Sequence, residues 1–146
     1  MSTTTMSKSE REAFLAETRM GIVSFTDPGR GPLTVPVWFH YEPGGVIRFA
    51  TGGASKKAKL LQESGRMTLM VQTESPPYKY VTVEGPARIA GKPDHERDIK
   101  AMAYRYLGDQ MGEMYLAAAA AEMEGSVLVE MTPERWLTVD YSKSFG

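Results

Sequence analysis

The feature that most restricts the fold of this chain is a series of short apolar stretches separated by turns too short to contain a helix. Asp27-Pro28-Gly29 follows the first stretch, and Glu42-Pro43-Gly44-Gly45 follows the second. Proline presets φ and glycine permits a positive φ, so both sequences are typical of tight turns. Two parallel strands need a crossover of about a dozen residues or more, so strands joined by these turns must be antiparallel.

Alternation of apolar and polar side chains identifies the strands themselves. Residues 33–41 alternate between an apolar face and a second face that carries Thr34, Pro36, Trp38 and His40. Apolar runs bounded by turn residues predict six further strands, over residues 21–26, 46–51, 66–73, 78–90, 127–131 and 135–141. Six or seven antiparallel strands with few flanking helices predict a mainly β (α+β) fold, either a barrel or a sandwich.

Helices are expected at the start of the chain and in three later segments. A Ser-x-x-Glu capping box at Ser7 or at Ser9 opens a short N-terminal helix. Ser55 is the expected N-cap of a second helix. Two late helices are predicted over residues 94–108 and 109–125, divided by a glycine.

The composition limits the chemistry that the chain can perform by itself. It has no cysteine and only two histidines, His40 and His95, so we expect no metal site and no thiol nucleophile. A formal net charge of −1 argues against nucleic acid or an anionic membrane as a partner. No apolar run approaches the roughly 20 residues needed to span a bilayer, and the N-terminal stretch lacks an apolar signal core, so we expect a cytoplasmic protein. Its length suits a flexible tail over residues 1–8 and a single domain over residues 9–146.

The strongest candidate binding site is the segment Ala50-Thr51-Gly52-Gly53-Ala54-Ser55-Lys56-Lys57-Ala58-Lys59. A strand runs into two glycines and then directly into a capped helix, whose free N–H groups favour an anion. Lys56, Lys57 and Lys59 add positive charge there, although lysine in a first helical turn opposes the helix dipole. The sequence therefore predicts a phosphate site, with a solvated lysine-rich helix start as the alternative.

These segments, in their order along the chain, resemble the split β-barrel superfamily of pyridoxamine 5'-phosphate oxidase-like proteins. The resemblance runs from about Phe14 to Val139 and includes Arg19-Met20-Gly21, Val35-Pro36-Val37-Trp38-Phe39, Ser55-Lys56-Lys57-Ala58 and Tyr80-Val81-Thr82-Val83-Glu84-Gly85. More narrowly, the chain is similar to the actinobacterial branch that uses the deazaflavin coenzyme F420. The resemblance implies an FMN-binding type of split barrel and a homodimer with cofactor sites at the subunit interface.

The resemblance also implies which residues contact the cofactor. The cofactor phosphate would meet the segment from Ser55 to Lys59, with Lys57 at the position of the family's phosphate-binding lysine. The ring system would lie along Val37, Trp38, Ala50 and Thr51, and Tyr78 and Tyr80 match aromatic positions close to the cofactor. The implied function is hydride transfer to or from a small conjugated or unsaturated organic substrate, by an oxidoreductase that uses coenzyme F420 or, alternatively, FMN.

Three side chains keep two interpretations each. His40 is a weak candidate for a catalytic proton donor, because a strand-surface histidine with ordinary partners is the more common arrangement. Trp38 could wall the cofactor ring or cover a subunit interface. Trp136 could reach the partner's site or pack in the core.

A flavin- or tetrapyrrole-binding protein without turnover is the alternative to an enzyme.

Overall fold

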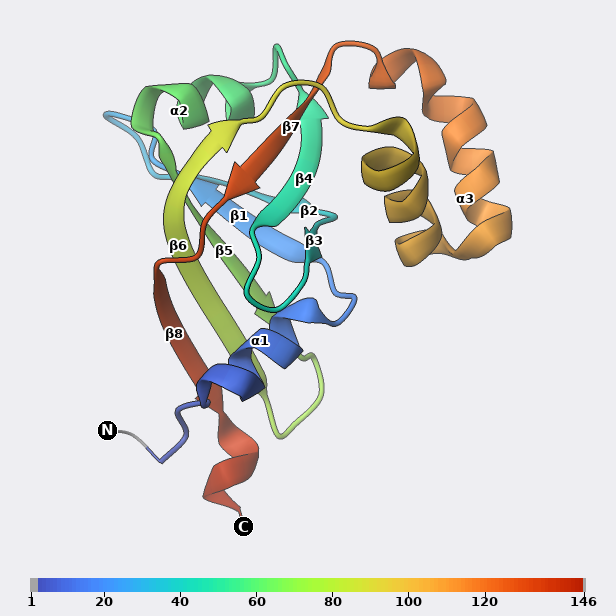
Figure 1. The fold of residues 1–146 in the computed structure, drawn as a ribbon. Coiled ribbons are helices and arrows are strands. Elements are labelled where there is room, and N and C mark those ends of the chain that lie inside the picture. Colours follow the sequence, from blue (N-terminus) through green and yellow to red (C-terminus); the bar gives the residue numbers. More distant parts are fainter. Residues whose placement is uncertain (1–2, 146) are drawn as a thin grey trace.

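The fold is an antiparallel sheet that curls into a split barrel, with helices along its inner side and at one edge (Figure 1). The computed structural model describes residues 3–145, and within that range eight strands form one sheet. The predicted fold class is therefore confirmed. The strands are β1 (Gly21–Phe25), β2 (Leu33–Val37), β3 (His40–Tyr41), β4 (Ile47–Gly52), β5 (Arg66–Gln72), β6 (Lys79–Ile89), β7 (Ser126–Met131) and β8 (Arg135–Asp140). The helices are α1 (Lys8–Ala16), α2 (Lys56–Ser64), the π-helix η1 (His95–Lys100), α3 (Ala101–Met123) and the 3-10 helix η2 (Tyr141–Ser144).

The long strand β6 organises the sheet. The strand order is β2-β1-β5-β6-β7-β4-β3, and β8 also pairs with β6. One edge of β6 pairs with β5. The other edge is shared, because β8 pairs with residues 79–84 and β7 pairs with residues 87–89. The strand therefore connects two parts of the sheet, one that ends at β2 and one that ends at β3.

Gly85 lies where the partner of β6 changes from β8 to β7. The connection between these two strands folds over it, because Thr132 N–H donates to Pro86 O at 2.9 Å and Glu134 N–H donates to Glu84 O at 2.9 Å. A Cβ atom on Gly85 would lie 1.8 Å from the carbonyl oxygen of Thr132. Gly85-Pro86 inside a strand pattern predicts a bulge or bend, and the structure has there a close backbone contact that only glycine permits.

Helices α1 and α2 cover the inner side of the sheet. Phe14 and Leu15 of α1 and Leu60 and Leu61 of α2 are buried in one core. That core also contains the inward side chains of the strands, among them Val23, Phe25, Phe49, Leu69, Val81, Val83 and Val129. The other face of the β2-β1-β5-β6-β8 part of the sheet therefore points away from these helices.

The strand predicted over residues 33–41 is divided into β2 and β3 at Trp38 and Phe39. The break has a physical cause, because the hydroxyl of Tyr106 forms hydrogen bonds with the backbone N–H and C=O groups of Phe39. Phe39 N–H donates to this hydroxyl at 3.1 Å, and the hydroxyl lies 2.7 Å from Arg19 O and 3.1 Å from Phe39 O. A side chain of α3 therefore replaces the neighbouring strand as the partner of this residue.

The N-terminal segment lies against β8. The capping box of α1 begins at Ser7, one of the two predicted alternatives. Before the helix, Met6 is buried and its N–H donates to Thr138 Oγ1 at 3.0 Å, while Asp140 N–H donates to Thr4 O at 2.8 Å. Within the predicted tail of residues 1–8, residues 4–6 thus form hydrogen bonds with the edge strand β8. Residues 1 and 2 lie outside the described range.

Helices η1 and α3 form a helical pair beside β3 and β4 (Figure 1). The predicted break is present, because Gly108 has a φ of 79° inside α3. After the break, the helix folds back so that Gly112 lies against the ring of Tyr104, and a Cβ on Gly112 would be 2.5 Å from that ring. Within residues 3–145, neither α3 nor any shorter helix combines the length and apolar character needed to cross a membrane.

Asp98 of η1 attaches this helical pair to the sheet. Its side chain is only 3% exposed and accepts two hydrogen bonds from Arg97 at 2.9 Å and one from Asp94 N–H at 2.8 Å. Arg48 Nε of β4 lies 3.6 Å from the same carboxylate. Burial opposes ionisation, but these donors and both guanidinium charges outweigh it, so the pKa of Asp98 lies below its ordinary value. The ionised carboxylate therefore links η1 to β4.

We expect Gly85→Ala to lower the free energy of unfolding by about 3 kcal/mol or more, because the backbone at Thr132 must move to admit a Cβ atom. Gly31→Ala is the matched control, since no atom lies within 4 Å of its Cβ position. It should change stability by less than about 0.5 kcal/mol. Urea unfolding followed by circular dichroism measures both. Equal stability of the two variants would contradict the contact.

Asp98→Asn should lower the free energy of unfolding by roughly 1–3 kcal/mol at neutral pH, since it removes a buried charge from two guanidinium partners. Asp109→Asn, an exposed acid at the helix break, is the control. The folded pKa of Asp98 is lowered, so its stabilising effect is present above the ordinary carboxyl pKa and is lost as the pH falls through the folded value. Urea unfolding at about pH 7 and about pH 3 should therefore show a difference between wild type and variant that shrinks in acid. A difference that does not change with pH would argue against the ion pair.

Candidate functional site

The N-terminus of α2 has the cap that the sequence predicts. Ser55 is the N-cap, and its hydroxyl accepts a hydrogen bond from Ala58 N–H at 3.2 Å. The same hydroxyl lies 3.4 Å from Thr51 Oγ1 on β4. Because α2 begins at Lys56, the N–H groups of Lys56 and Lys57 precede the first carbonyl partner that the helix can supply. These N–H groups and the Ser55 hydroxyl form a possible anion site.

The three lysines of α2 differ in their partners. Lys56 Nζ lies 2.8 Å from Asp27 Oδ2 in the β1–β2 turn, so its charge is already paired. Lys57 is partly buried and Lys59 is exposed, and neither forms an ion pair with any residue of the described range. Unpaired positive charge is therefore concentrated at Lys57 and Lys59, in the first turn of the helix.

The two glycines before α2 have different roles. Gly53 N–H donates to Gly125 O at 2.9 Å, and a Cβ atom on Gly53 would lie 2.9 Å from that oxygen. Glycine here lets the β4–α2 connection pass close to the backbone before β7. A glycine at either position can let the backbone approach a ligand closely, but at Gly53 the close neighbour is the chain itself. Gly52 has no such neighbour and lines the cavity beside β4.

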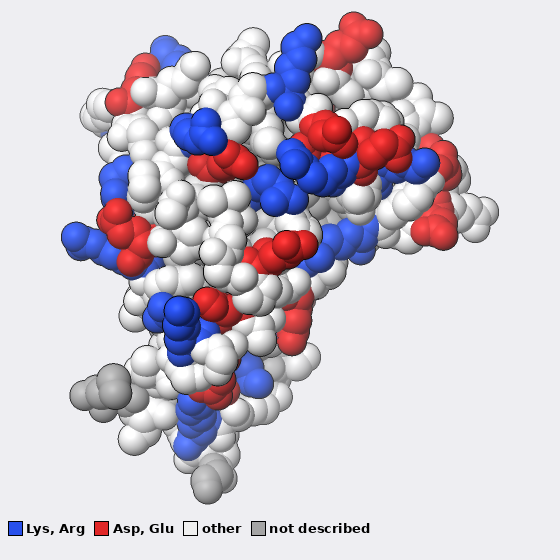
Figure 2. Space-filling view, viewed as in Figure 1, with Lys and Arg blue, Asp and Glu red and all other residues white. Residues whose placement is uncertain are grey.

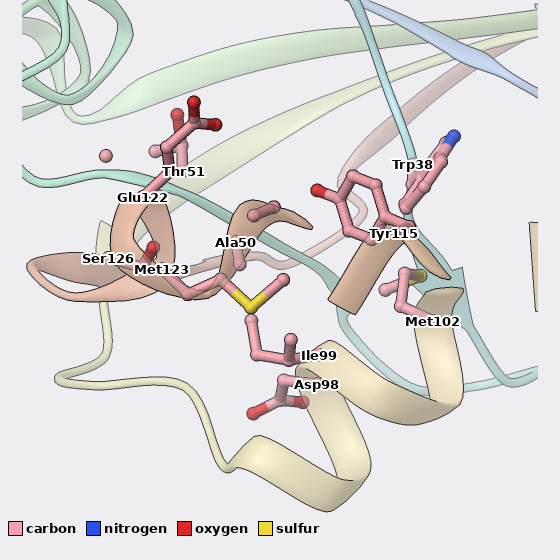
Figure 3. Close-up of a pocket in the computed structure, with 12 residues that line it drawn as sticks. Trp38, Ala50, Thr51, Asp98, Ile99, Met102, Tyr115, Glu122, Met123 and Ser126 are labelled. Atoms are coloured by element: carbon pink, nitrogen blue, oxygen red, sulfur yellow. The ribbon is translucent and has the colours of Figure 1, made fainter. Parts of the chain in front are cut away.

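A cavity of about 210 Å³ lies between β4 and the η1–α3 pair (Figure 3). Three of the residues predicted to contact the cofactor ring, Trp38, Ala50 and Thr51, line it. Trp38 and Tyr115 stand together at one end, and Thr51 lies toward the other (Figure 3). The remaining lining residues are Gly52, Asp98, Ile99, Met102, Ala119, Glu122, Met123 and Ser126.

Aromatic residues of α3 fix the orientation of Trp38. Its ring stacks on Tyr106 with a centroid distance of 5.3 Å and an interplanar angle of 8°. Tyr115 packs on it at 5.1 Å and 57°. Burial raises the pKa of Tyr106, so its hydroxyl stays protonated and keeps its hydrogen bonds to the backbone. Trp38 thus packs within its own chain and also forms part of the cavity wall.

The helical side of this cavity was not identified from the sequence. The helical spacing of Met102 and Met123 is typical of core or dimer packing, yet both line the cavity. Asp98, Tyr115 and Glu122 were not singled out. Helical spacing cannot indicate which face of residues 94–125 packs against β4. That face is set by the contact between Asp98 and Arg48 and by the change of direction at Gly108.

The other residues predicted to contact the cofactor lie elsewhere. Val37 is buried in the core. Tyr80 pairs with Gln72 at the end of β5 farthest from α2, about 20 Å along a seven-residue strand. Tyr78 precedes β6 and is 50% exposed. One chain therefore does not bring Tyr78 and Tyr80 together with the lysines of α2.

His40 lies on β3, opposite Arg48 of β4 and outside the cavity that Trp38 lines. Burial lowers the pKa of His40, and the charges of Arg48 and Arg105 lower it further, although Glu42 lies 3.5 Å from Nε2. The imidazole is therefore neutral at neutral pH. This makes His40 a poor proton donor under those conditions.

Trp136 packs within its own chain. Its ring meets Tyr41 edge-on at 6.4 Å, and the guanidinium of Arg11 lies 4.5 Å from its centroid. It is half-buried against the core. Of the two interpretations of Trp136, packing is the one that these contacts support.

Charged side chains of both signs are interspersed over the face shown in Figure 2. This agrees with a net charge of −1, and no field of one sign covers that face. Among residues 3–145, no group of three or more His, Asp or Glu side chains is placed to hold a metal ion. Any binding of anions must therefore depend on local positive charge.

Comparison with solved structures supports the same fold. The protein Rv2991 from Mycobacterium tuberculosis has a TM-score of 0.81 at 22% identity, over 100% of this chain and 92% of that one. A structure described as an F420 reductase has a TM-score of 0.68 at 21% identity, over 86% and 94%. An FAD-binding protein from Mesorhizobium loti has a TM-score of 0.60 at 16% identity, over 91% and 92%.

Sequence comparison assigns the family. No curated protein sequence matches the chain. The family described as pyridoxamine 5'-phosphate oxidase matches residues 7–140, which is nearly the whole chain from the cap of α1 to the end of β8. With the split barrel in place, this match settles the family: the chain belongs to the pyridoxamine 5'-phosphate oxidase family.

Proposed function

We propose that the protein is an oxidoreductase that binds the deazaflavin coenzyme F420 and transfers hydride between it and a small conjugated or unsaturated organic substrate. The observation that carries this proposal is the unpaired charge of Lys57 and Lys59 at the start of α2, directly after the strand that walls the cavity. The similar folds of an F420 reductase and an FAD-binding protein favour a deazaflavin or flavin. FMN is the alternative, because it also carries a phosphate.

The residues present suit such a cofactor. The Ser55 hydroxyl, the first N–H groups of α2 and the side chains of Lys57 and Lys59 would hold its phosphate. The small side chain of Ala50 leaves room beside β4 for a flat ring, and Trp38 offers an aromatic surface next to it. When bound, the cofactor supplies the redox chemistry that a chain without cysteine lacks.

A homodimer is part of this proposal. The cavity of about 210 Å³ is smaller than the roughly 300–1,000 Å³ of typical small-molecule sites. Tyr78 and Tyr80 are also too far along the sheet to reach it within one chain. A second chain would supply the missing walls, including these two tyrosines.

We expect the second chain to cover the outer face of the sheet. Five residues form one row of register partners across this face, and they are Pro36, Ile22, Met70, Thr82 and Leu137. The side chain of Leu137 is 61% exposed, and a hollow of about 590 Å³ lies beside Ile22 and Met70. Tyr80 projects from the same face as Thr82, because the two are two residues apart on β6. Exposed apolar surface of this kind marks an interface.

Lys57→Ala should weaken binding of coenzyme F420 and of FMN by roughly tenfold to a hundredfold, because it removes one charge-assisted contact. Lys59→Ala should cost less, since Lys59 lies further into the helix and is exposed. The difference from wild type should shrink at high salt, where the contact is screened. Fluorescence titration at two salt concentrations measures these affinities.

Lys8→Ala is the matched control for this experiment, because Lys8 is an exposed lysine at the start of α1. It should bind both cofactors as tightly as wild type. If Lys57→Ala also binds like wild type, the start of α2 is only a solvated helix end. Binding without turnover of any reducible substrate would leave a cofactor-binding protein in place of the enzyme.

Leu137→Glu should convert the protein from a dimer to a monomer, because it places a charge in the proposed interface. Sedimentation equilibrium should then give the chain mass of 16.1 kDa in place of twice that value. Met114→Glu is the control, since Met114 is 66% exposed on α3. Dissociation by Met114→Glu with no effect of Leu137→Glu would place the interface on α3 and contradict the proposal.

A further inference from the structure

A second cavity lies beside the helical pair and shares the Met102 side chain with the first. It measures about 250 Å³ and is lined by His40 of β3 and by Arg97, Ala101, Met102 and Arg105 of the helical pair. Met102 lines both cavities. The phosphate site proposed at α2 uses none of these residues, so this cavity needs an explanation of its own.

Positive charge dominates the surroundings of this cavity. Arg97 and Arg105 line it, and Arg48 lies opposite His40 in the β3–β4 pair. Among the described residues, the only buried carboxylate nearby is Asp98, which holds Arg97 with two hydrogen bonds and lies 3.6 Å from Arg48 Nε. Asp94 and Glu130 also attract the charge of Arg97, although Glu130 is paired with Arg88 at 2.8 Å. Arg105 forms no ion pair within residues 3–145, so its charge is the one that the nearby acids leave unbalanced.

The remaining acid near His40 does not restore the balance. Glu42 lies 3.5 Å from His40 Nε2, but its side chain is 80% exposed. Water therefore screens it, and a charge of this kind contributes little inside the cavity. The burial and the two arginines that lower the pKa of His40 act more strongly than Glu42.

One donor of Arg105 is also left without an acceptor. Arg105 Nη2 donates to Ala16 O at 2.8 Å, which ties α3 to the end of α1. Its Nε, however, is buried and has no hydrogen-bond partner among the described residues. Arg48 Nε lacks a hydrogen bond as well, but it faces the Asp98 carboxylate at 3.6 Å and Arg48 does not line this cavity. Buried donors without acceptors are uncommon in folded proteins, and they point to an acceptor that a ligand supplies.

We propose that this cavity binds an oxyanion, a carboxylate or phosphate group of a small acid, through Arg97, Arg105 and His40. The excess of guanidinium charge sets the sign of the ligand, and the planar donors of arginine match the oxygens of both groups. A volume of about 250 Å³ admits one such group with a short carbon chain and excludes a whole flavin. The site is separate from the phosphate site at α2.

His40 provides a direct reporter of this site. A bound anion would add negative charge beside an imidazole whose pKa the charges of Arg48 and Arg105 lower and that of Glu42 raises. It should therefore raise the pKa of His40, and by linkage the anion should bind more tightly at lower pH. His95 is the only other histidine, so His95→Gln leaves a single imidazole resonance to follow.

The test is a titration of full-length His95→Gln protein with inorganic phosphate and, separately, with glutarate, followed by the imidazole resonances in NMR spectra. Chloride at the same ionic strength is the reference. We expect saturable shifts of the His40 resonance with midpoints of ~1–10 mM and a raised pKa of His40 at saturation. Saturation by one anion alone supports the site and identifies its preferred group. Shifts no larger than those with chloride would overturn the proposal.

Variants separate this site from its surroundings. Arg105→Gln should weaken anion binding by about tenfold or more, whereas Arg135→Gln, an exposed arginine on β8, should not change it. Arg97→Gln is a second variant, in case Arg105→Gln does not fold. Lys57→Ala should leave the titration of His40 unchanged even if it abolishes cofactor binding. Loss of the His40 response in Lys57→Ala would show that the anion binds at α2 instead.

Discussion

The close approach between Gly85 and the carbonyl oxygen of Thr132 is the constraint on which the sheet depends. It allows the β7–β8 connection to pass directly over β6, so that one strand pairs with β8 along its first half and with β7 along its second. The sheet can therefore curl around a single core while β7, β4 and β3 continue it to the other side. A side chain at this point would separate the two halves, because a backbone oxygen cannot rotate away as a side chain can.

Two polar contacts then hold the η1–α3 pair against the curled sheet. Asp98 joins it to Arg48 of β4, and the hydroxyl of Tyr106 holds the backbone of Phe39 between β2 and β3. Both contacts are at least partly buried, so neither is strongly weakened by solvent. They place α3 where it stacks on Trp38 and where Met102 lines two cavities. One helical pair therefore forms a wall of the proposed ring site and of the proposed oxyanion site.

Local charge, rather than net charge, determines what these sites attract. The chain as a whole carries a formal charge of −1. Near α2, Asp27 pairs with Lys56 and leaves Lys57 and Lys59 unpaired. Near β3, the buried carboxylate of Asp98 contacts Arg48 and Arg97, and Arg105 forms no ion pair within the described residues. Exposed charges elsewhere are interspersed and largely screened at distances beyond about 10 Å. Two separate positive regions thus exist on a chain whose composition predicts no general affinity for polyanions.

The sequence by itself determined the strands, the capped start of α2 and the glycine break in the late helices, because turn chemistry, capping and alternation depend on neighbouring residues. It also indicated the lysines and the β4 residues of the candidate site, since these follow one another along the chain. Only the tertiary structure decided that Lys56 is paired, that Tyr106 divides a predicted strand and that α3 contributes to both cavities. These outcomes depend on contacts between residues far apart in the sequence, such as Lys56 with Asp27 and Tyr106 with Phe39. Periodicity shows which residues share a buried face of a helix or strand, but tertiary packing decides which residues that face contacts.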